Sequence, residues 1–333
     1  MLPLLNKISA YVAGAPKLRV GAALGRNGIR AAILHQHDGV WQIARVQEIP
    51  VSVALFEGAP PPDAVQVLTQ ALASLLPEAV GNFVPLHLAL PGAAVSLRVF
   101  GLDAVPKAEP DRINLARWRM TQELAVNYEL VCAYQILAEG TTPEQGENSS
   151  ELPGSELPGN ELLAIAMDGR WLACLTEACR AAQIVPTVID AGYSFLFNHF
   201  HAEIAALQAC CALICLESDS WSMLVIDQQA RIRLARSWWR NPAATATQAA
   251  DFQFIALEAE QAIRAYVLSG ATPIQQISIA GEGADIKSLA AILDQRMQQP
   301  GNMLAATGDE VTNNLQLELR GFSTTLAVAF DFR

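Results

Sequence analysis

Apolar and polar residues alternate between residues 19 and 46, and turn residues interrupt the alternation twice. The runs RVGAALG and IRAAILHQH are joined by Asn27-Gly28, and Asp38-Gly39 joins the second run to VWQIARV. Asn-Gly and Asp-Gly between alternating runs are strong signals for two-residue hairpins. The pattern therefore predicts a three-stranded antiparallel meander.

A helix and a strand follow the meander. From Asp63 to Leu76, apolar residues recur every three or four positions, which is typical of an amphipathic helix. The apolar run VPLHLALPG at 84–92 then predicts a strand.

The same order of elements returns in the second half of the chain. It comprises three short apolar runs with polar turns between them, a long helical pattern, one more strand and a final helical stripe, at 211–217, 221–227, 231–238, 251–268, 277–280 and 286–297. The sequence thus predicts an internal duplication of architecture without repetition of sequence.

A different unit separates the two halves. It reads as a strand, a helix, two strands and a helix, at 94–102, 111–127, 130–138, 161–169 and 170–183. Residues 139–160 are polar, rich in Pro and Gly, and contain SELPG twice, so we expect a mobile loop at a hairpin end.

Composition limits the classes of function. The 333 residues are 52% hydrophobic and carry a net charge of −11, which disfavours nucleic acid as a partner. No apolar run approaches the ~18 residues of a membrane span, and the N-terminus lacks a signal peptide. We therefore expect a cytoplasmic chain without a membrane span.

Metal chemistry and the common catalytic motifs have little support. The six cysteines form no CxxC pair, and the His35–His37 and His199–His201 pairs have no accompanying cluster of ligands. GxSxG, GxxxxGK[ST] and HExxH are also absent from the sequence. We expect no metal ion and assign no catalytic residue.

Four stretches together resemble one known family. They are LALPGAAVSLRVF (88–100), AAQIVPTVIDAGYSFLFNHF (181–200), AEQAIRAYVLSGATPIQQISIAGEGADIKSLAAIL (259–293) and TTLAVAFDFR (324–333). Their order is similar to that of PilM, an actin-like protein of type IV pilus assembly, and of its MSHA-pilus (MshI-like) counterpart. FtsA and the cytoplasmic domain of GspL are related to this family.

The resemblance implies an α/β, actin-like (ribonuclease H-like) duplicated fold with a small strand-helix-strand-strand insertion. It places the first actin-like domain at 18–92 and 186–206, the inserted domain at 93–185, and the second actin-like domain at 207–333. It also implies that the stretch 324–333 is a terminal helix.

In actin-like ATPases, two hairpin turns contact the phosphates, and each supplies an Asp for magnesium followed by a Gly. The resemblance places Ala23 at the first Asp position, Cys215 at the second, and Glu217 at the second Gly position. Both magnesium anchors are then missing. A Glu217 carboxylate ~4 Å from a triphosphate charge would cost about 4 kcal/mol at an effective dielectric of 20.

Five residues remain as candidates for a weak ATP or ADP site. Gly25 lies at the first turn, and the resemblance places Gly281 and Gly283 beside adenosine, although such glycines also permit close strand–helix packing. Asp219 substitutes for a lost carboxylate by a register slip, or else forms a turn. Asp190 positions a metal, or else caps the helix that begins near Ala191.

The resemblance implies a non-enzymatic scaffold at the inner membrane. Its partner is the N-terminal cytoplasmic tail of a PilN-like bitopic membrane protein, held in a groove between the inserted domain and the first actin-like domain. The alternative is an active actin-like ATPase or sugar-kinase relative that uses Asp190, Asp219 and Gly281. Arg117, Trp118, Arg119 and Trp238-Trp239-Arg240 are either partner contacts or core residues.

Overall fold

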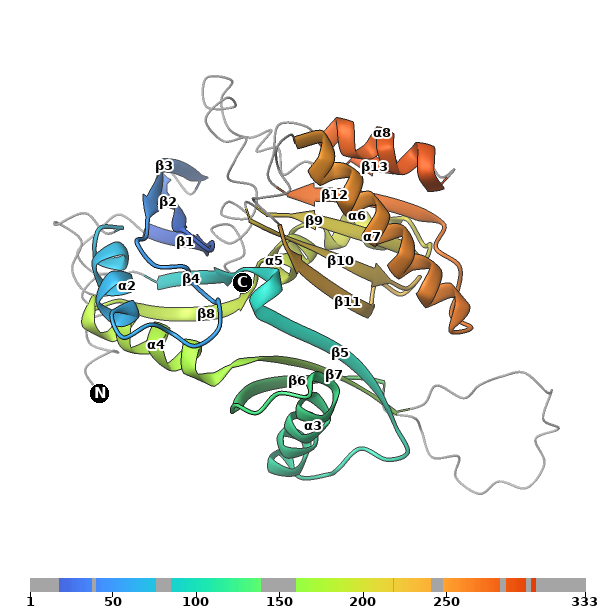
Figure 1. Cartoon of the computed structure of the whole chain (residues 1–333), viewed down its shortest axis with the longest axis horizontal. Helices are drawn as coiled ribbons and strands as arrows, with labels where there is room; N and C mark the ends of the chain where they lie inside the picture. Colours follow the sequence, from blue (N-terminus) through green and yellow to red (C-terminus); the bar gives the residue numbers. More distant parts are fainter. Residues whose placement is uncertain are drawn as a thin grey trace.

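The computed structural model describes residues 18–37, 40–75, 85–138, 160–217, 219–240, 248–281, 286–297 and 301–303. These residues form two five-stranded sheets and one three-stranded sheet, each accompanied by helices (Figure 1). Asp38-Gly39, residues 139–159, Gly283 and the stretch 324–333 lie outside the described residues.

The first lobe is built on a sheet of strand order β3-β2-β1-β4-β8. Its strands are β1 (Leu18–Leu24), β2 (Gly28–His37), β3 (Val40–Pro50), β4 (Pro85–Leu90) and β8 (Val185–Ala191). β1, β2 and β3 pair antiparallel, with Leu24 opposite Ile29 across the Asn27-Gly28 turn. This confirms the predicted meander. β4 and β8 run parallel to β1.

The second lobe repeats this order as β11-β10-β9-β12-β13. Its strands are β9 (Cys211–Leu216), β10 (Ser220–Ile226), β11 (Ile232–Trp239), β12 (Gln276–Gly281) and β13 (Gly301–Met303). The first three are again antiparallel and the last two parallel to β9. The predicted duplication of architecture is confirmed.

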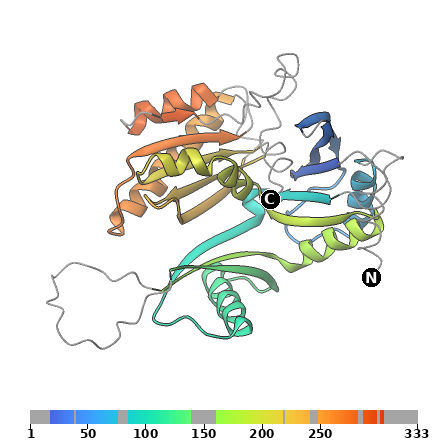
Figure 2. The same cartoon turned by 180° about the vertical axis from the view of Figure 1, so that it is seen from behind.

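The inserted unit lies between the two halves in sequence. It contains β5 (Val95–Leu102), α3 (Glu109–Leu124), β6 (Leu130–Ala138) and β7 (Asn160–Asp168). The strands pair antiparallel in the order β5-β7-β6, and α3 packs on β6 and β7 over a small core of its own. A short 3₁₀ helix, η1 (Gly92–Ala94), joins β4 to β5, which runs from the lobes to the inserted sheet (Figure 2).

Within the described residues the predicted helices form, most with shifted ends. α2 (Ala64–Ala73) of the first lobe and α4 (Gly169–Ala181), which follows β7, pack against each other and bury one face each. α7 (Gln248–Leu268) and α8 (Ile286–Met297) cover one face of the second sheet. The helix predicted over 111–127 ends at Leu124, because Ala125 adopts a left-handed conformation with φ 49°.

The two lobes share part of one hydrophobic core. In β9, Ala212, Ile214 and Leu216 face α7 and α8, whereas Cys211, Leu213 and Cys215 join the core of the first lobe. α5 (Gly192–His199) packs on β4 and β8 and also on β9, and the short α6 (His201–Ala206) follows it. This arrangement brings the β1–β2 turn and the β9–β10 turn toward each other between the two lobes (Figure 1).

Candidate functional site

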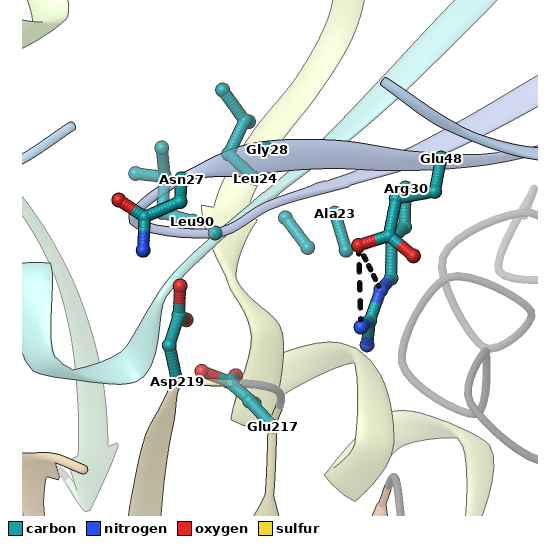
Figure 3. A pocket seen from close by; sticks show the side chains of 11 residues that line it. Ala23, Leu24, Asn27, Gly28, Arg30, Glu48, Leu90, Glu217 and Asp219 are labelled. Carbon is teal, nitrogen blue, oxygen red and sulfur yellow. Dashed lines mark hydrogen bonds and ion pairs between the residues drawn. The ribbon is translucent and has the colours of Figure 1, made fainter. Parts of the chain in front are cut away.

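A cavity of about 230 Å³ lies between the two lobes, where the β1–β2 turn faces the β9–β10 turn. Figure 3 shows its lining, with Asn27 and Gly28 on one side and Glu217 and Asp219 on the other. Ala23 and Gly25 also line it. These are the two turns that the sequence comparison with actin-like ATPases singled out.

The first turn is closed by its own backbone. The Gly25 N–H donates to the carbonyl of Gly28 at 2.8 Å. Beside it, Arg30 pairs with Glu48 at 3.4 Å on the wall of the cavity. Ala23 presents only a methyl group, so this strand supplies no metal ligand at the predicted position.

Arg240, which follows β11, holds the second turn, between β9 and β10, in place. The Arg240 N–H donates to the carbonyl of Asp219 at 2.9 Å, and its guanidinium donates to the carbonyl of Glu217 at 3.3 Å. The same guanidinium pairs with the buried carboxylate of Asp251 at 2.8 Å. Cys215, at the other predicted Asp position, is fully buried in the shared core, and burial raises its pKa.

Both acidic side chains of the second turn reach across the cleft. The Asp219 carboxylate accepts a hydrogen bond from the backbone N–H of Arg26 in the β1–β2 turn. The Glu217 carboxylate accepts from the N–H of Gly92 at 2.9 Å and from the hydroxyl of Ser220. We call these two interlobe contacts, Asp219 to Arg26 and Glu217 to Gly92, the carboxylate bridge.

Glu217 is only 6% exposed. Burial, opposed by the hydrogen bonds from Ser220 and Gly92 and assisted by the charge of Asp219, raises the pKa of Glu217 from 4.5 to about 7. Its second oxygen, Oε1, has no hydrogen-bond partner within the described residues. The resemblance to actin-like ATPases implied that the Glu217 carboxylate would lie beside a bound triphosphate. In the structure it is buried against the opposite lobe.

Close packing and an aromatic contact accompany the bridge. A Cβ added at Gly92 would lie 2.0 Å from the hydroxyl of Ser222 and 3.1 Å from the ring of Tyr193. The Arg26 guanidinium lies 5.9 Å from the ring centroid of Trp239, which comes from the second lobe. The lobes therefore meet at the cleft without a gap at Gly92.

The other predicted site residues are dispersed around the cleft. Asp190 is the second-to-last residue of β8, and its carboxylate accepts a hydrogen bond from the Ala191 N–H at 2.7 Å. The prediction that Asp190 caps the next helix is wrong, because β8 continues through Ala191 and Ala191 itself is the N-cap of α5. Gly281 ends β12, opposite Leu216. Gly283 lies outside the described residues.

The aromatic and arginine candidates divide into two groups. In α3, Trp118 is 55% exposed, with the Arg119 guanidinium 5.3 Å from its ring centroid. Trp238 instead stacks on the fully buried Trp221, with centroids 4.1 Å apart. Trp238 and Arg240 therefore make internal contacts, whereas Trp118 faces solvent.

A second concavity, of about 170 Å³, separates the first lobe from the inserted unit. One wall is the β3–α2 loop, where Gly58 accepts a hydrogen bond from Trp171 at 2.8 Å and Phe56 contacts the Trp171 ring. The other wall is formed by residues of the inserted unit, Ser96 and Asp168 among them, together with Ala93, Ala94 and Arg170. We call this concavity the lobe–insertion groove.

Charged and aromatic groups lie side by side in the lobe–insertion groove. The Arg170 guanidinium pairs with Asp168 at 2.6 Å and lies 4.8 Å from the ring centroid of Tyr128. Leu124, Leu130 and Met167 add apolar surface. The groove thus combines charged, aromatic and apolar groups, and a cleft with a few polar groups for orientation is typical of peptide and small-molecule sites. Sequence reasoning predicted a groove in this place but did not identify these residues.

Solved structures with similar backbones identify the fold. A chain of the PilM-PilN type IV pilus biogenesis complex matches with a TM-score of 0.70 and 16% identity over 93% of this chain and 97% of that chain. A protein of actin-like ATPase fold and unknown function from Bacteroides thetaiotaomicron matches with a TM-score of 0.52 and 12% identity over 92% and 96%. No protein-family model and no curated protein sequence matches significantly.

These likenesses show that the chain has the actin-like ATPase fold, which confirms the predicted fold class. No helix among the described residues is long and apolar enough to cross a membrane.

Proposed function

We propose that this chain is a non-enzymatic scaffold of type IV or MSHA-type pilus assembly. It binds the N-terminal cytoplasmic tail of a PilN-like inner-membrane protein and is thereby recruited from the cytoplasm to the membrane. The observation that carries the proposal is the likeness over 93% of this chain to a chain of the PilM-PilN complex. The sequence motifs at 88–100 and 259–293 support the same family.

The proposed binding site is the lobe–insertion groove. It has aromatic and apolar walls for side-chain pockets, and its Asp168–Arg170 pair offers polar contacts to a peptide. Extended peptides bind such grooves by main-chain hydrogen bonds and a few anchored side chains. The proposed domains are 18–92 with 186–206, the inserted domain 93–185, and 207–333, so the groove lies between the first two.

The proposal includes a nucleotide site that no longer hydrolyses ATP. Ala23 and Cys215 lack the carboxylates that would anchor magnesium, and the β9–β10 turn presents Glu217 and Asp219 to the cavity. We therefore expect tail binding to be independent of nucleotide. Magnesium-dependent ATP binding at micromolar concentrations, measured by calorimetry, would favour the alternative, an active ATPase.

The test is a binding measurement with a peptide corresponding to the tail of the PilN-like protein from the same organism. Ser96 lines the groove on β5, and Ser96→Trp should fill it and weaken peptide binding at least tenfold. Gln122→Trp, on the exposed face of α3 outside the groove, is the matched control and should bind as the wild type does. Equal affinity of all three proteins, or no binding by the wild type, would contradict the proposal.

A further inference from the structure

Two backbone amides of the first lobe point across the cleft toward the second lobe. They belong to Arg26, in the turn after β1, and to Gly92, directly after β4 and Pro91. Amides exposed at turns are the groups with which proteins bind phosphate oxygens, because they donate without a side chain in the way. In this chain, a side-chain oxygen of Asp219 already accepts a hydrogen bond from the Arg26 amide, and one of Glu217 accepts from the Gly92 amide.

We propose that side-chain oxygens of Glu217 and Asp219 occupy the Arg26 and Gly92 amides, so that the chain's own acceptors take the place of nucleotide phosphates in joining the lobes. The inference rests on the proposed function, to which it adds a reason why the scaffold works without nucleotide. It concerns the cleft, whereas the tail is proposed to bind at the lobe–insertion groove.

The second turn is built to hold the carboxylates in this position. Arg240 bonds the carbonyls of both residues, and Arg240 is in turn anchored by the buried Asp251. Ser220 donates to the same Glu217 carboxylate that Gly92 contacts. Side-chain carboxyl oxygens accept hydrogen bonds from backbone amides as phosphate oxygens do, so they are competent substitutes for phosphate oxygens.

Gly92 supports the same assignment from the first lobe. Because a Cβ here would lie 2.0 Å from Ser222, only glycine lets the η1 backbone approach β10 closely enough for its amide to reach Glu217. The absence of a side chain at Gly92 and the Glu217 acceptor of the β9–β10 turn thus both serve one contact.

Occupation of the two amides by side-chain oxygens would exclude phosphate in a different way from electrostatic repulsion by the carboxylates. Two double variants distinguish these explanations. Glu217→Ala with Asp219→Ala removes the acceptors of both amides and enlarges the cavity that the two side chains line. Glu217→Gln with Asp219→Asn removes the charge but keeps an oxygen acceptor at each amide. If occupancy excludes phosphate, only the double alanine variant gains binding.

The experiment measures binding of tripolyphosphate and of ADP to the full chain by calorimetry. We expect the double alanine variant to bind tripolyphosphate at least tenfold more tightly than the wild type and the Gln/Asn variant. Equal binding by wild type and double alanine variant overturns the proposal. So does equal binding by the Gln/Asn and alanine variants, because charge alone would then explain the exclusion.

Hydrogen exchange at the Arg26 and Gly92 amides provides a second measurement. Both should be protected in the nucleotide-free wild type, exchange at least tenfold faster in the double alanine variant, and regain protection with tripolyphosphate. If that variant does not fold, Asp219→Ala alone should expose the Arg26 amide; unchanged exchange there overturns the proposal. Tail affinity measured on the same proteins shows separately whether the scaffold function fails.

Discussion

At the scale of single residues, Gly92 and Glu217 determine how the lobes meet. They are 125 positions apart, yet their backbone and side chain form a buried hydrogen bond. Such a contact has no local signature in the sequence, because neither residue predicts its partner. The Asn27-Gly28 hairpin was predictable, since its cause lies within two residues.

Replacing Gly92 by alanine should destabilise the fold. The added methyl group overlaps Ser222 and contacts Tyr193, so the backbone must shift and lengthen its bond to Glu217. We expect the free energy of unfolding to fall by about 1–3 kcal/mol, the usual cost of overpacking. Gly101→Ala is the matched control, because a Cβ there meets nothing within 4 Å. Chemical denaturation of both variants measures the difference, and equal stability would contradict the packing at Gly92.

Glu217 should make stability depend on pH. Its pKa is raised from 4.5 to about 7 in the folded chain, so between these values the folded chain holds a proton that the unfolded chain releases. The contribution is fully present below about pH 4.5 and is lost as the pH rises to about 7. The slope over this window is about 1.4 kcal/mol per pH unit.

Glu217→Gln removes the titration and keeps acceptors for the Gly92 and Ser220 donors. The difference in unfolding free energy between wild type and variant should therefore change by about 3 kcal/mol between pH 4.5 and 7. Denaturation curves across this range measure it. A difference that stays constant with pH would show that folding does not raise the pKa of Glu217.

At the scale of elements, the repeated hydrophobic pattern predicted the three antiparallel strands and the adjacent parallel strand of each five-stranded sheet, but neither β8 nor β13. The strands and turns are local, and each lobe pairs them in the same order. Ends of elements were harder to predict. One interpretation of the sequence made Asp190 a helix cap, because this acidic residue shortly precedes GYSFLF. Pairing of β8 with β4 instead extends the strand to Ala191. The sequence could not reveal this pairing, which spans the insertion.

An ion pair joins two elements that the sequence keeps apart. Arg233 of β11 and Glu161 of β7 form a two-pronged pair, with one of the N–O distances 2.5 Å, and β5 packs against β11 nearby. Their side chains are mostly buried, at 27% and 20% exposure. This pair connects the inserted unit to the second lobe.

Arg233→Met should destabilise the chain by about 1–2 kcal/mol, because Glu161 loses its partner in a partly buried place. The exposed pair Arg180–Glu177 on α4 is the control, and Arg180→Met should cost less than about 0.5 kcal/mol. Thermal unfolding of the two variants makes the comparison. Equal costs would mean that the Arg233–Glu161 pair contributes no more than a surface pair.

At the scale of the whole molecule, the cleft and the lobe–insertion groove share one stretch of chain. Gly92 contacts Glu217 in the cleft, whereas the next two residues, Ala93 and Ala94, line the groove. The fold and its duplication were predictable, because hydrophobic periodicity carries that information along the chain. The geometry of the cleft could not be predicted from the sequence, because it depends on how the sheet of the second lobe packs relative to that of the first.

The position of the insertion also affects how the chain emerges during synthesis. The first lobe pairs β4 with β8, and all strands of the inserted sheet lie between these two in the chain. The inserted sheet, complete at Asp168, can thus form on the ribosome before Val185–Ala191 arrives to finish the sheet of the first lobe. Until then β4 is an unpaired edge on the nascent chain, and slow translation between the two strands prolongs its exposure to aggregation.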